Sequence, residues 1–400
     1  MSVDELTAIS RFYGADRDYV VAGGGNTSFK DGDVLYIKGS GASLAEVENA
    51  SFVRMDRRAL AAIWEKTYRA DPDEREGAVL ADMMAARKRG EEHKRPSVET
   101  LLHDLLPFAF VVHTHPALVN GLTCSQNGEA AAGSLFGDDA VWIPSINPGY
   151  ILSLAVKRAL EECRTRKAVI FLQNHGVFVG ADSPEGIKER YRFIMEKIGS
   201  QIKRQPDLSA LPGESGAGFG ESEKAAAVFA ELAGGSPVSF LRNREIAALT
   251  RSRDAFSPVS SAFTPDHIVY AGSDPLFVEL PESEIPGVSF AGVLERAWKE
   301  HVNRTGRAPR IAAVRGMGVF GIAPSDKAVK TALELFIDAV KVAVYAESFG
   351  GPLFMSRDKI DFINNWEVER YRSQVAGTGP SKTDQSGKEG ASYEGLRIRK

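Results

Sequence analysis

Cysteine is nearly absent from this chain of 400 residues, which holds only Cys124 and Cys163. Two cysteines exclude a disulfide-stapled scaffold and fit a reducing compartment. No apolar run approaches the roughly 18 to 20 residues that a membrane span requires. Residues 1–6 also lack the apolar core of a signal peptide. We therefore expect a cytoplasmic protein with no membrane partner.

An excess of positive charge is missing too. The chain carries 49 Lys and Arg against 53 Asp and Glu, for a net charge of -4 at pH 7. Because nucleic-acid binding depends on a positive surface field, we expect no nucleic-acid partner. A hydrophobic content of 43% with 26% charged residues is typical of a soluble globular protein.

Short strand patterns alternate with helical patterns along the chain, which predicts an α/β protein. The length suggests two or three folding units. We expect a catalytic domain over residues 1–205 and a linker rich in Gly, Pro and Ser over 206–222. A second α/β region follows over 223–376. Residues 377–400 contain few apolar side chains and predict a disordered tail.

An internal similarity connects the two predicted regions. Residues 168–187 align without gaps on residues 310–329, with five identities in twenty positions. Both segments predict a strand, a glycine turn, a second strand and a serine-capped helix. This pattern favours the interpretation that the second region is a degenerate second copy.

Three histidines form a candidate metal site. His113 and His115 are two residues apart on a predicted strand, so both side chains point to the same face. His175 lies at a strand end before a glycine turn. Three histidines that leave one coordination position open are typical of catalytic zinc sites. The alternative is that these are packed or surface histidines.

Glu99 is the candidate catalytic carboxylate. It lies in the first turn of a helix predicted to open at Pro96 and Ser97, where an acidic residue also favours the helix dipole. His103, four residues further on, is its expected partner on the same helical face. A carboxylate beside a Lewis-acidic metal is what an enolisation needs.

Two glycine-rich segments predict an anion cradle. Residues 23–28 read GGGNTS and residues 38–41 read KGSG, and such loops present several backbone N–H groups to an anion. Ser97, at a predicted helix start, would be a third donor. A flexible turn is the alternative for these loops.

Residues 316–321 match the pattern G-x-G-x-x-G, which in dinucleotide-binding proteins opens a helix. Here residues 319–322 predict a strand, and the next helix begins at Ser325. We therefore expect no NAD site at this motif.

Over roughly residues 5–205 the chain resembles the class II aldolase/adducin family, because it has the motifs GGGNTS, KGSG, PSVE with HTHP, and NHG in this order. The segment between Glu99 and His113 is most similar to the aldolase part of bifunctional rhamnulose-1-phosphate aldolase/alcohol dehydrogenase proteins. The resemblance implies an α/β/α sandwich with a mainly antiparallel central sheet. It also implies a homo-oligomer.

The resemblance assigns roles to particular residues. It implies zinc, or another divalent transition metal, on His113, His115 and His175, with Glu99 as the acid and base. The residues implied to hold a substrate phosphate are Asn26, Ser40, Gly41 and Ser97. Val98 stands where related aldolases have a second serine, which removes one hydroxyl from this set.

The implied activity is a metal-dependent aldolase reaction. A ketose 1-phosphate of the rhamnulose or fuculose type would be cleaved to dihydroxyacetone phosphate and a hydroxyaldehyde. A sugar-phosphate epimerase or decarboxylase with the same metal site is the nearest alternative. A non-enzymatic scaffold like adducin is another, although a scaffold has no need of the histidines and Glu99.

Overall fold

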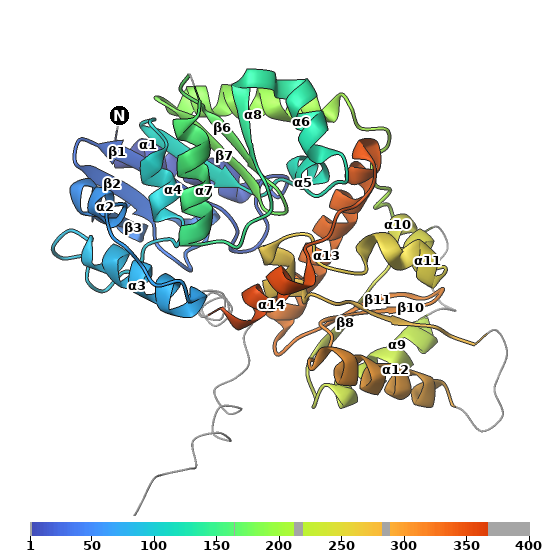
Figure 1. The fold of residues 1–400 in the computed structure, drawn as a ribbon. Coiled ribbons are helices and arrows are strands. Elements are labelled where there is room, and N and C mark those ends of the chain that lie inside the picture. Colours follow the sequence, from blue (N-terminus) through green and yellow to red (C-terminus); the bar gives the residue numbers. More distant parts are fainter. Residues whose placement is uncertain (1, 164, 212–218, 282–288, 367–400) are drawn as a thin grey trace, which may run out of the picture.

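The computed structural model describes residues 2–163, 165–211, 219–281 and 289–366, and two β-sheets organise them (Figure 1). The predicted tail and residues 212–218 of the predicted linker lie outside the described residues. Among the helices in the described part of the chain, none has the length and apolar character needed to cross a membrane.

The first sheet has seven strands in the order β3-β2-β1-β4-β7-β6-β5. Neighbouring strands are antiparallel except for the parallel pair β5 and β6. The strands are β1 (Asn26–Asp31), β2 (Val34–Lys38), β3 (Phe52–Asp56), β4 (Phe110–Thr114), β5 (Ala140–Ile143), β6 (Val169–Leu172) and β7 (Gly176–Ala181).

Helices cover both faces of this sheet. Apolar side chains of α1 (Val3–Ala15), α5 (Ala117–Thr123), α6 (Gly128–Phe136) and α8 (Pro184–Gly199) share one hydrophobic cluster with the sheet. Two further clusters join the sheet to α2 (Arg57–Ile63), α3 (Pro72–Ala85), α4 (Thr100–Leu105) and α7 (Tyr150–Glu161). The predicted α/β/α sandwich with a mainly antiparallel sheet is therefore confirmed.

The second sheet has four strands in the order β8-β11-β10-β9. They are β8 (Val238–Leu241), β9 (Leu276–Val278), β10 (Ile311–Val314) and β11 (Gly318–Ile322). The helices of this region are α9 (Phe219–Leu232), α10 (Arg244–Leu249), α11 (Arg253–Phe256), α12 (Phe290–Thr305), α13 (Asp326–Ala346) and α14 (Arg357–Asn365). A π-helical turn, η5 (His267–Ala271), precedes β9. Short 3₁₀ turns are η1 (Leu44–Glu46), η2 (Asn49–Ser51), η3 (Gly137–Asp139), η4 (Ser257–Val259) and η6 (Glu347–Phe349).

The second sheet repeats part of the first in order, direction and register. The series β8-β11-β10-β9 has the same pattern of antiparallel and parallel neighbours as β4-β7-β6-β5. Val169 pairs with Val179 in one hairpin, and the aligned Ile311 pairs with Gly321 in the other. The second sheet has no counterparts of β1, β2 and β3 among the described residues.

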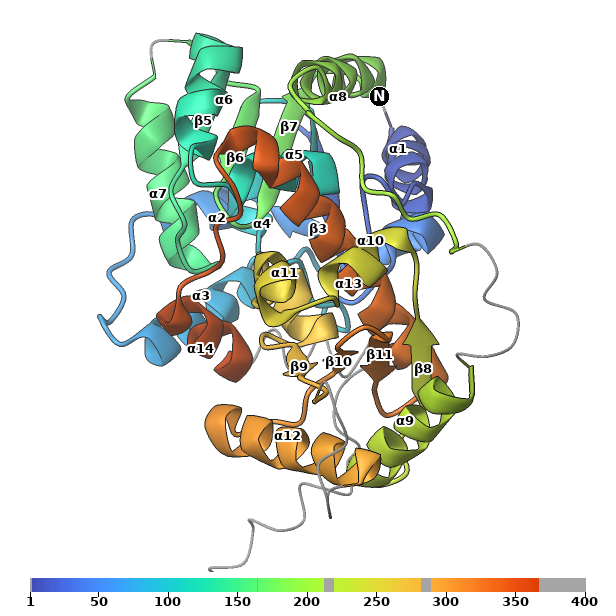
Figure 2. The ribbon, with the colours of Figure 1, turned by 90° about the vertical axis from the view of Figure 1, so that its right-hand side faces the viewer.

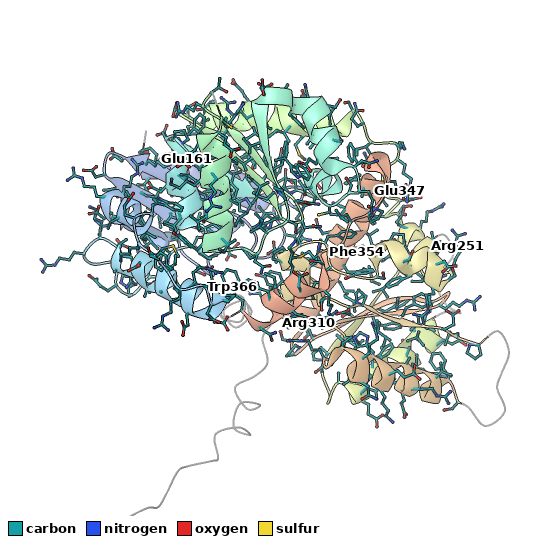
Figure 3. The ribbon with its side chains drawn as sticks, viewed as in Figure 1. Glu161, Arg251, Arg310, Glu347, Phe354 and Trp366 are labelled. Carbon is teal, nitrogen blue, oxygen red and sulfur yellow. The ribbon has the colours of Figure 1, made fainter. Side chains whose placement is uncertain are left out.

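Helix α13 lies between the two sheets in both views (Figures 1 and 2). It packs on α5, where a Cβ on Gly121 would come within 2.3 Å of the Tyr345 Cβ. One hydrophobic cluster contains Ala117 and Cys124 of the first region together with many residues of the second. Trp366 follows α14 and packs beside Gly149, near α3 in Figure 3.

One predicted helix start is wrong, and one helix overlaps the predicted linker. Helix α4 begins at Thr100 rather than at Pro96, because Pro96 is extended and forms an isolated bridge with Gly39. Helix α9 begins at Phe219, inside the predicted linker 206–222. The predicted strand at residues 319–322 and the helix start at Ser325 are confirmed by β11 and by the Ser325 N-cap of α13. The G-x-G-x-x-G motif therefore lies in a β-hairpin.

Candidate metal centre and anion pocket

The three predicted histidines converge at the end of strand β4. His113 lies on β4 opposite Asn26 of β1, and His115 follows the strand end. His175 lies in the turn between β6 and β7. One ring nitrogen from each histidine lies within 4.8 Å of the other two. The two-residue spacing on a strand therefore brings His113 and His115 together as the sequence predicts.

Hydrogen bonds set which nitrogen of two imidazoles carries the proton. Nδ1 of His113 donates to the Val177 carbonyl at 3.0 Å, and Nδ1 of His115 donates to Asp266 Oδ2 at 2.6 Å. In the neutral rings both Nε2 atoms then carry lone pairs. These two Nε2 atoms lie 2.9 Å apart, so two acceptors face one another.

His175 is held by an unusual backbone turn. The preceding residue, Asn174, has a φ of 59°, in the left-handed region that asparagine tolerates better than most residues. Its side-chain Nδ2 donates to the Leu353 carbonyl at 2.8 Å. The turn that carries His175 is therefore fixed by a residue of the second region.

Glu99 is buried at the N-cap of α4, beside the histidines. Its Oε1 lies 3.4 Å from His113 Nε2 and 3.5 Å from His175 Nε2. The same oxygen accepts no hydrogen bond, whereas Oε2 accepts one from Asn26 Nδ2 at 2.6 Å. A buried carboxylate oxygen without a donor is costly unless another group compensates it.

The ionisation of the site favours a cation. Burial lowers the pKa of His113 well below its usual range, so this imidazole is neutral. Burial acts to raise the pKa of Glu99, but positive charge on the imidazoles of His113 and His175, when these are protonated, and the hydrogen bond from the Asn26 amide lower it to about 2. Beside neutral imidazoles, the Asn26 hydrogen bond still favours the ionised carboxylate. An ionised carboxylate therefore lies beside converging nitrogen lone pairs. Imidazole nitrogens and a carboxylate are the donors that zinc and similar divalent metals bind, so these residues fit such an ion.

Asn26 connects Glu99 to His103. Besides its bond to Glu99, Asn26 Nδ2 donates to Ser97 Oγ at 3.2 Å, and its Oδ1 is bonded to His103 Nε2. Burial lowers the pKa of His103 to about 3. The predicted pairing of His103 with Glu99 is therefore indirect, through Asn26. The other ring nitrogen of His103 bonds Ser28 Oγ at 2.8 Å.

A pocket beside the histidines collects the predicted anion-binding residues. Asn26, Ser40, Gly41 and Ser97 all line it, together with Glu99, His115 and His175. Lys38 of the predicted KGSG cradle also lines it, as do three residues that the sequence analysis did not select: Pro148, Pro265 and Asp266. Lys38 Nζ donates to the Ala42 carbonyl at 2.7 Å. Because Lys38 is the first residue of the predicted KGSG cradle, the sequence already indicated a lysine at the anion-binding loop.

Comparisons with known proteins agree with this description. Residues 4–196 match the family described as the class II aldolase and adducin N-terminal domain. The chain is 24% identical to a Bacillus subtilis protein named uncharacterized oxidoreductase YuxG, over 94% of this chain and 58% of that protein. The chain thus spans 58% of the length of this curated relative.

Solved structures with similar folds align with about half of the chain. One is the N-terminal class II aldolase domain of a conserved protein from Thermoplasma acidophilum, with 27% identity and a TM-score of 0.43, over 50% of this chain and 93% of that chain. Another is the L-fuculose-1-phosphate aldolase of Thermus thermophilus, with 17% identity and a TM-score of 0.32, over 49% and 91%. By the family match, residues 4–196 are similar to the class II aldolase and adducin N-terminal domain.

Proposed function

We propose that the chain is a metal-dependent aldolase that cleaves a ketose 1-phosphate, of the rhamnulose or fuculose 1-phosphate type, to dihydroxyacetone phosphate and a hydroxyaldehyde. One observation carries the proposal. Three histidine nitrogens and the buried carboxylate of Glu99 converge in the same pocket that holds the predicted anion-binding residues.

His113, His115 and His175 would hold the divalent metal, which supplies Lewis acidity toward negative charge on the substrate oxygens. Glu99 moves the proton. Oε2 of Glu99 accepts the hydrogen bond from Asn26 Nδ2, whereas Oε1 accepts none. Oε1 is therefore the oxygen that would exchange protons with the substrate. It accepts the proton of the hydroxyl on the fourth carbon while the bond between the third and fourth carbons breaks. It then returns a proton to the third carbon of the three-carbon fragment.

The phosphate would bind at the other side of the pocket. Lys38 is the last residue of β2, and Ser40 and Gly41 lie in the loop that follows. The ammonium group of Lys38 is buried with the pocket residues, with 4% of the residue exposed. This positive charge supports an anionic substrate although Val98 has replaced a hydroxyl of related aldolases.

An epimerase or a decarboxylase would use the same histidines and Glu99. Only the reaction products would distinguish these enzymes from an aldolase. The name of the Bacillus subtilis relative suggests redox chemistry for that longer protein. In dinucleotide-binding proteins the G-x-G-x-x-G motif leads into a helix, whereas in this chain it leads into strand β11. The motif therefore does not support hydride transfer by this chain.

The test is a cleavage assay on the zinc-loaded full chain with a panel of ketose 1-phosphates, in which released dihydroxyacetone phosphate is measured. We expect one member of the panel to be cleaved and Glu99→Gln to lower its kcat by about 10²- to 10⁴-fold. Glu129→Gln is the matched control, because Glu129 is exposed on α6, outside the pocket.

Consumption of a sugar phosphate without release of dihydroxyacetone phosphate would assign the site to an epimerase or decarboxylase. Absence of any reaction with zinc bound would overturn enzymatic function of this type and favour the scaffold. An unchanged kcat in Glu99→Gln would remove Glu99 from the mechanism.

A further inference from the structure

The second region reaches into the metal centre through one carboxylate. Asp266 precedes the π-helical turn η5, 151 residues after His115 in the sequence. Its Oδ2 accepts a hydrogen bond of 2.6 Å from His115 Nδ1, and only 4% of the residue is exposed. π-Helical turns are rare and often lie at functional sites, which makes this placement informative.

A buried network fixes the backbone that carries Asp266. The next residue, His267, bonds Thr264 Oγ1 through Nδ1 at 3.1 Å and Asp338 Oδ2 through Nε2 at 3.1 Å. All three residues are buried, and Asp338 belongs to α13. Thr264 and His267 lie before and after Asp266 in the sequence, and both have hydrogen-bond partners in this network. The network therefore holds the backbone at Asp266 in place.

The glycine loop of the first region leaves room for this contact. A Cβ on Gly24 would lie 2.5 Å from Asp266 Oδ2 and 3.1 Å from His115 Nδ1. Only a residue without a side chain fits between the glycine loop and the bonded pair. The contact is therefore built from three separate segments of the fold.

We propose that Asp266 is a positioning residue for the metal ligand His115, so that the metal centre is completed by the second region. A carboxylate that accepts the Nδ1 proton of a ligating histidine fixes the ring and makes Nε2 a stronger donor. In this role Asp266 acts through His115. The inference rests on the proposed metal centre.

The test measures zinc affinity in the full chain by competition with a chromophoric chelator, and the visible absorption of the cobalt(II)-loaded protein. We expect Asp266→Asn to weaken zinc binding by about 10- to 100-fold and to change the cobalt spectrum. Asp266→Ala loses the acceptor as well as the charge and is expected to weaken binding more. Asp274→Asn is the matched control, since Asp274 pairs with Arg357 outside the pocket.

A double-mutant cycle separates positioning from general structural damage. In a His115→Ala background, Asp266→Asn should cause no further loss of zinc affinity, because its partner ring is gone. An equal loss in both backgrounds, or wild-type affinity and an unchanged cobalt spectrum in Asp266→Asn, would overturn the inference. A wild-type chain that binds no zinc would instead overturn the metal centre itself.

Discussion

Asn26 ties together residues to which the sequence assigns separate roles. Its amide bonds the proposed proton shuttle Glu99, the hydroxyl of Ser97 and the ring of His103. The side chain therefore does more than line the anion pocket, since it also fixes which oxygen of Glu99 is available. A change at Asn26 should affect turnover as well as substrate binding.

Lys38 gives a sharper residue-scale prediction. We expect Lys38→Met to raise KM for a ketose 1-phosphate by about 10- to 100-fold, because a hydrogen bond to a charged group is worth roughly 1.5–3 kcal/mol. Steady-state kinetics on the cleaved substrate measure this. Lys30→Met is the control, since Lys30 also donates to a backbone carbonyl, that of Phe108 at 2.9 Å, but does not line the pocket. Equal KM changes in both variants would exclude a specific role for Lys38.

At the scale of elements, the two hairpins place the same backbone turn in different chemical settings. Asn174 has a φ of 59° and the aligned Gly316 has a φ of 70°, so both turns enter the left-handed region. The residue that follows is His175 in the first hairpin and Met317 in the second. Met317 is buried among apolar side chains of the second sheet. The hairpin geometry is thus independent of the metal ligand it carries.

The glycine loop before β1 gives the prediction at this scale. Gly24→Ala should weaken zinc binding and lower the free energy of unfolding by about 1–3 kcal/mol, because its Cβ would press on Asp266 and His115. Gly133→Ala is the control: it lies exposed on α6 with open space around it, and alanine should stabilise the helix by up to about 1 kcal/mol. Urea unfolding and zinc titration measure both effects. Wild-type zinc affinity in Gly24→Ala would contradict the close packing.

For the whole molecule, the matching registers identify what the second region has in place of the metal ligands. Phe178 pairs with His113 in the first sheet, and Phe320, aligned with Phe178, pairs with Phe240 in the second. Phe240 therefore corresponds to His113. By the same register Arg242 corresponds to His115, and Met317 corresponds to His175. None of these three side chains offers an imidazole.

We therefore expect one tightly bound zinc per chain. Titration of the metal-free protein with zinc should saturate at about one equivalent, and His175→Ala should replace this tight binding by weak binding with the fold retained. His301→Gln is the control, because His301 is buried in the second region away from the pocket and should leave the stoichiometry unchanged. Two equivalents of tight zinc in the wild-type chain would show that the second region keeps a site of its own.

The sequence was sufficient for features that depend on short spacing. The alternation of side chains along a strand placed His113 and His115 on one face, and the strand and cap signals around Ser325 excluded a dinucleotide turn. The strand end at His175 and the helix signal at Glu99 indicated the same site, and the family resemblance assigned roles to both residues. These predictions succeed because a few neighbouring residues decide the local geometry.

Tertiary structure alone decided the contacts between distant segments. The bond between His115 and Asp266 joins the two regions, and no periodicity relates residues 151 positions apart. The bridge between Pro96 and Gly39 likewise explains why α4 begins at Thr100 and not at Pro96, where the sequence predicts a helix start. The contact between His115 and Asp266 depends on how α13 packs the second region against the first. Packing of this kind depends on the shapes of whole surfaces, which single motifs do not encode.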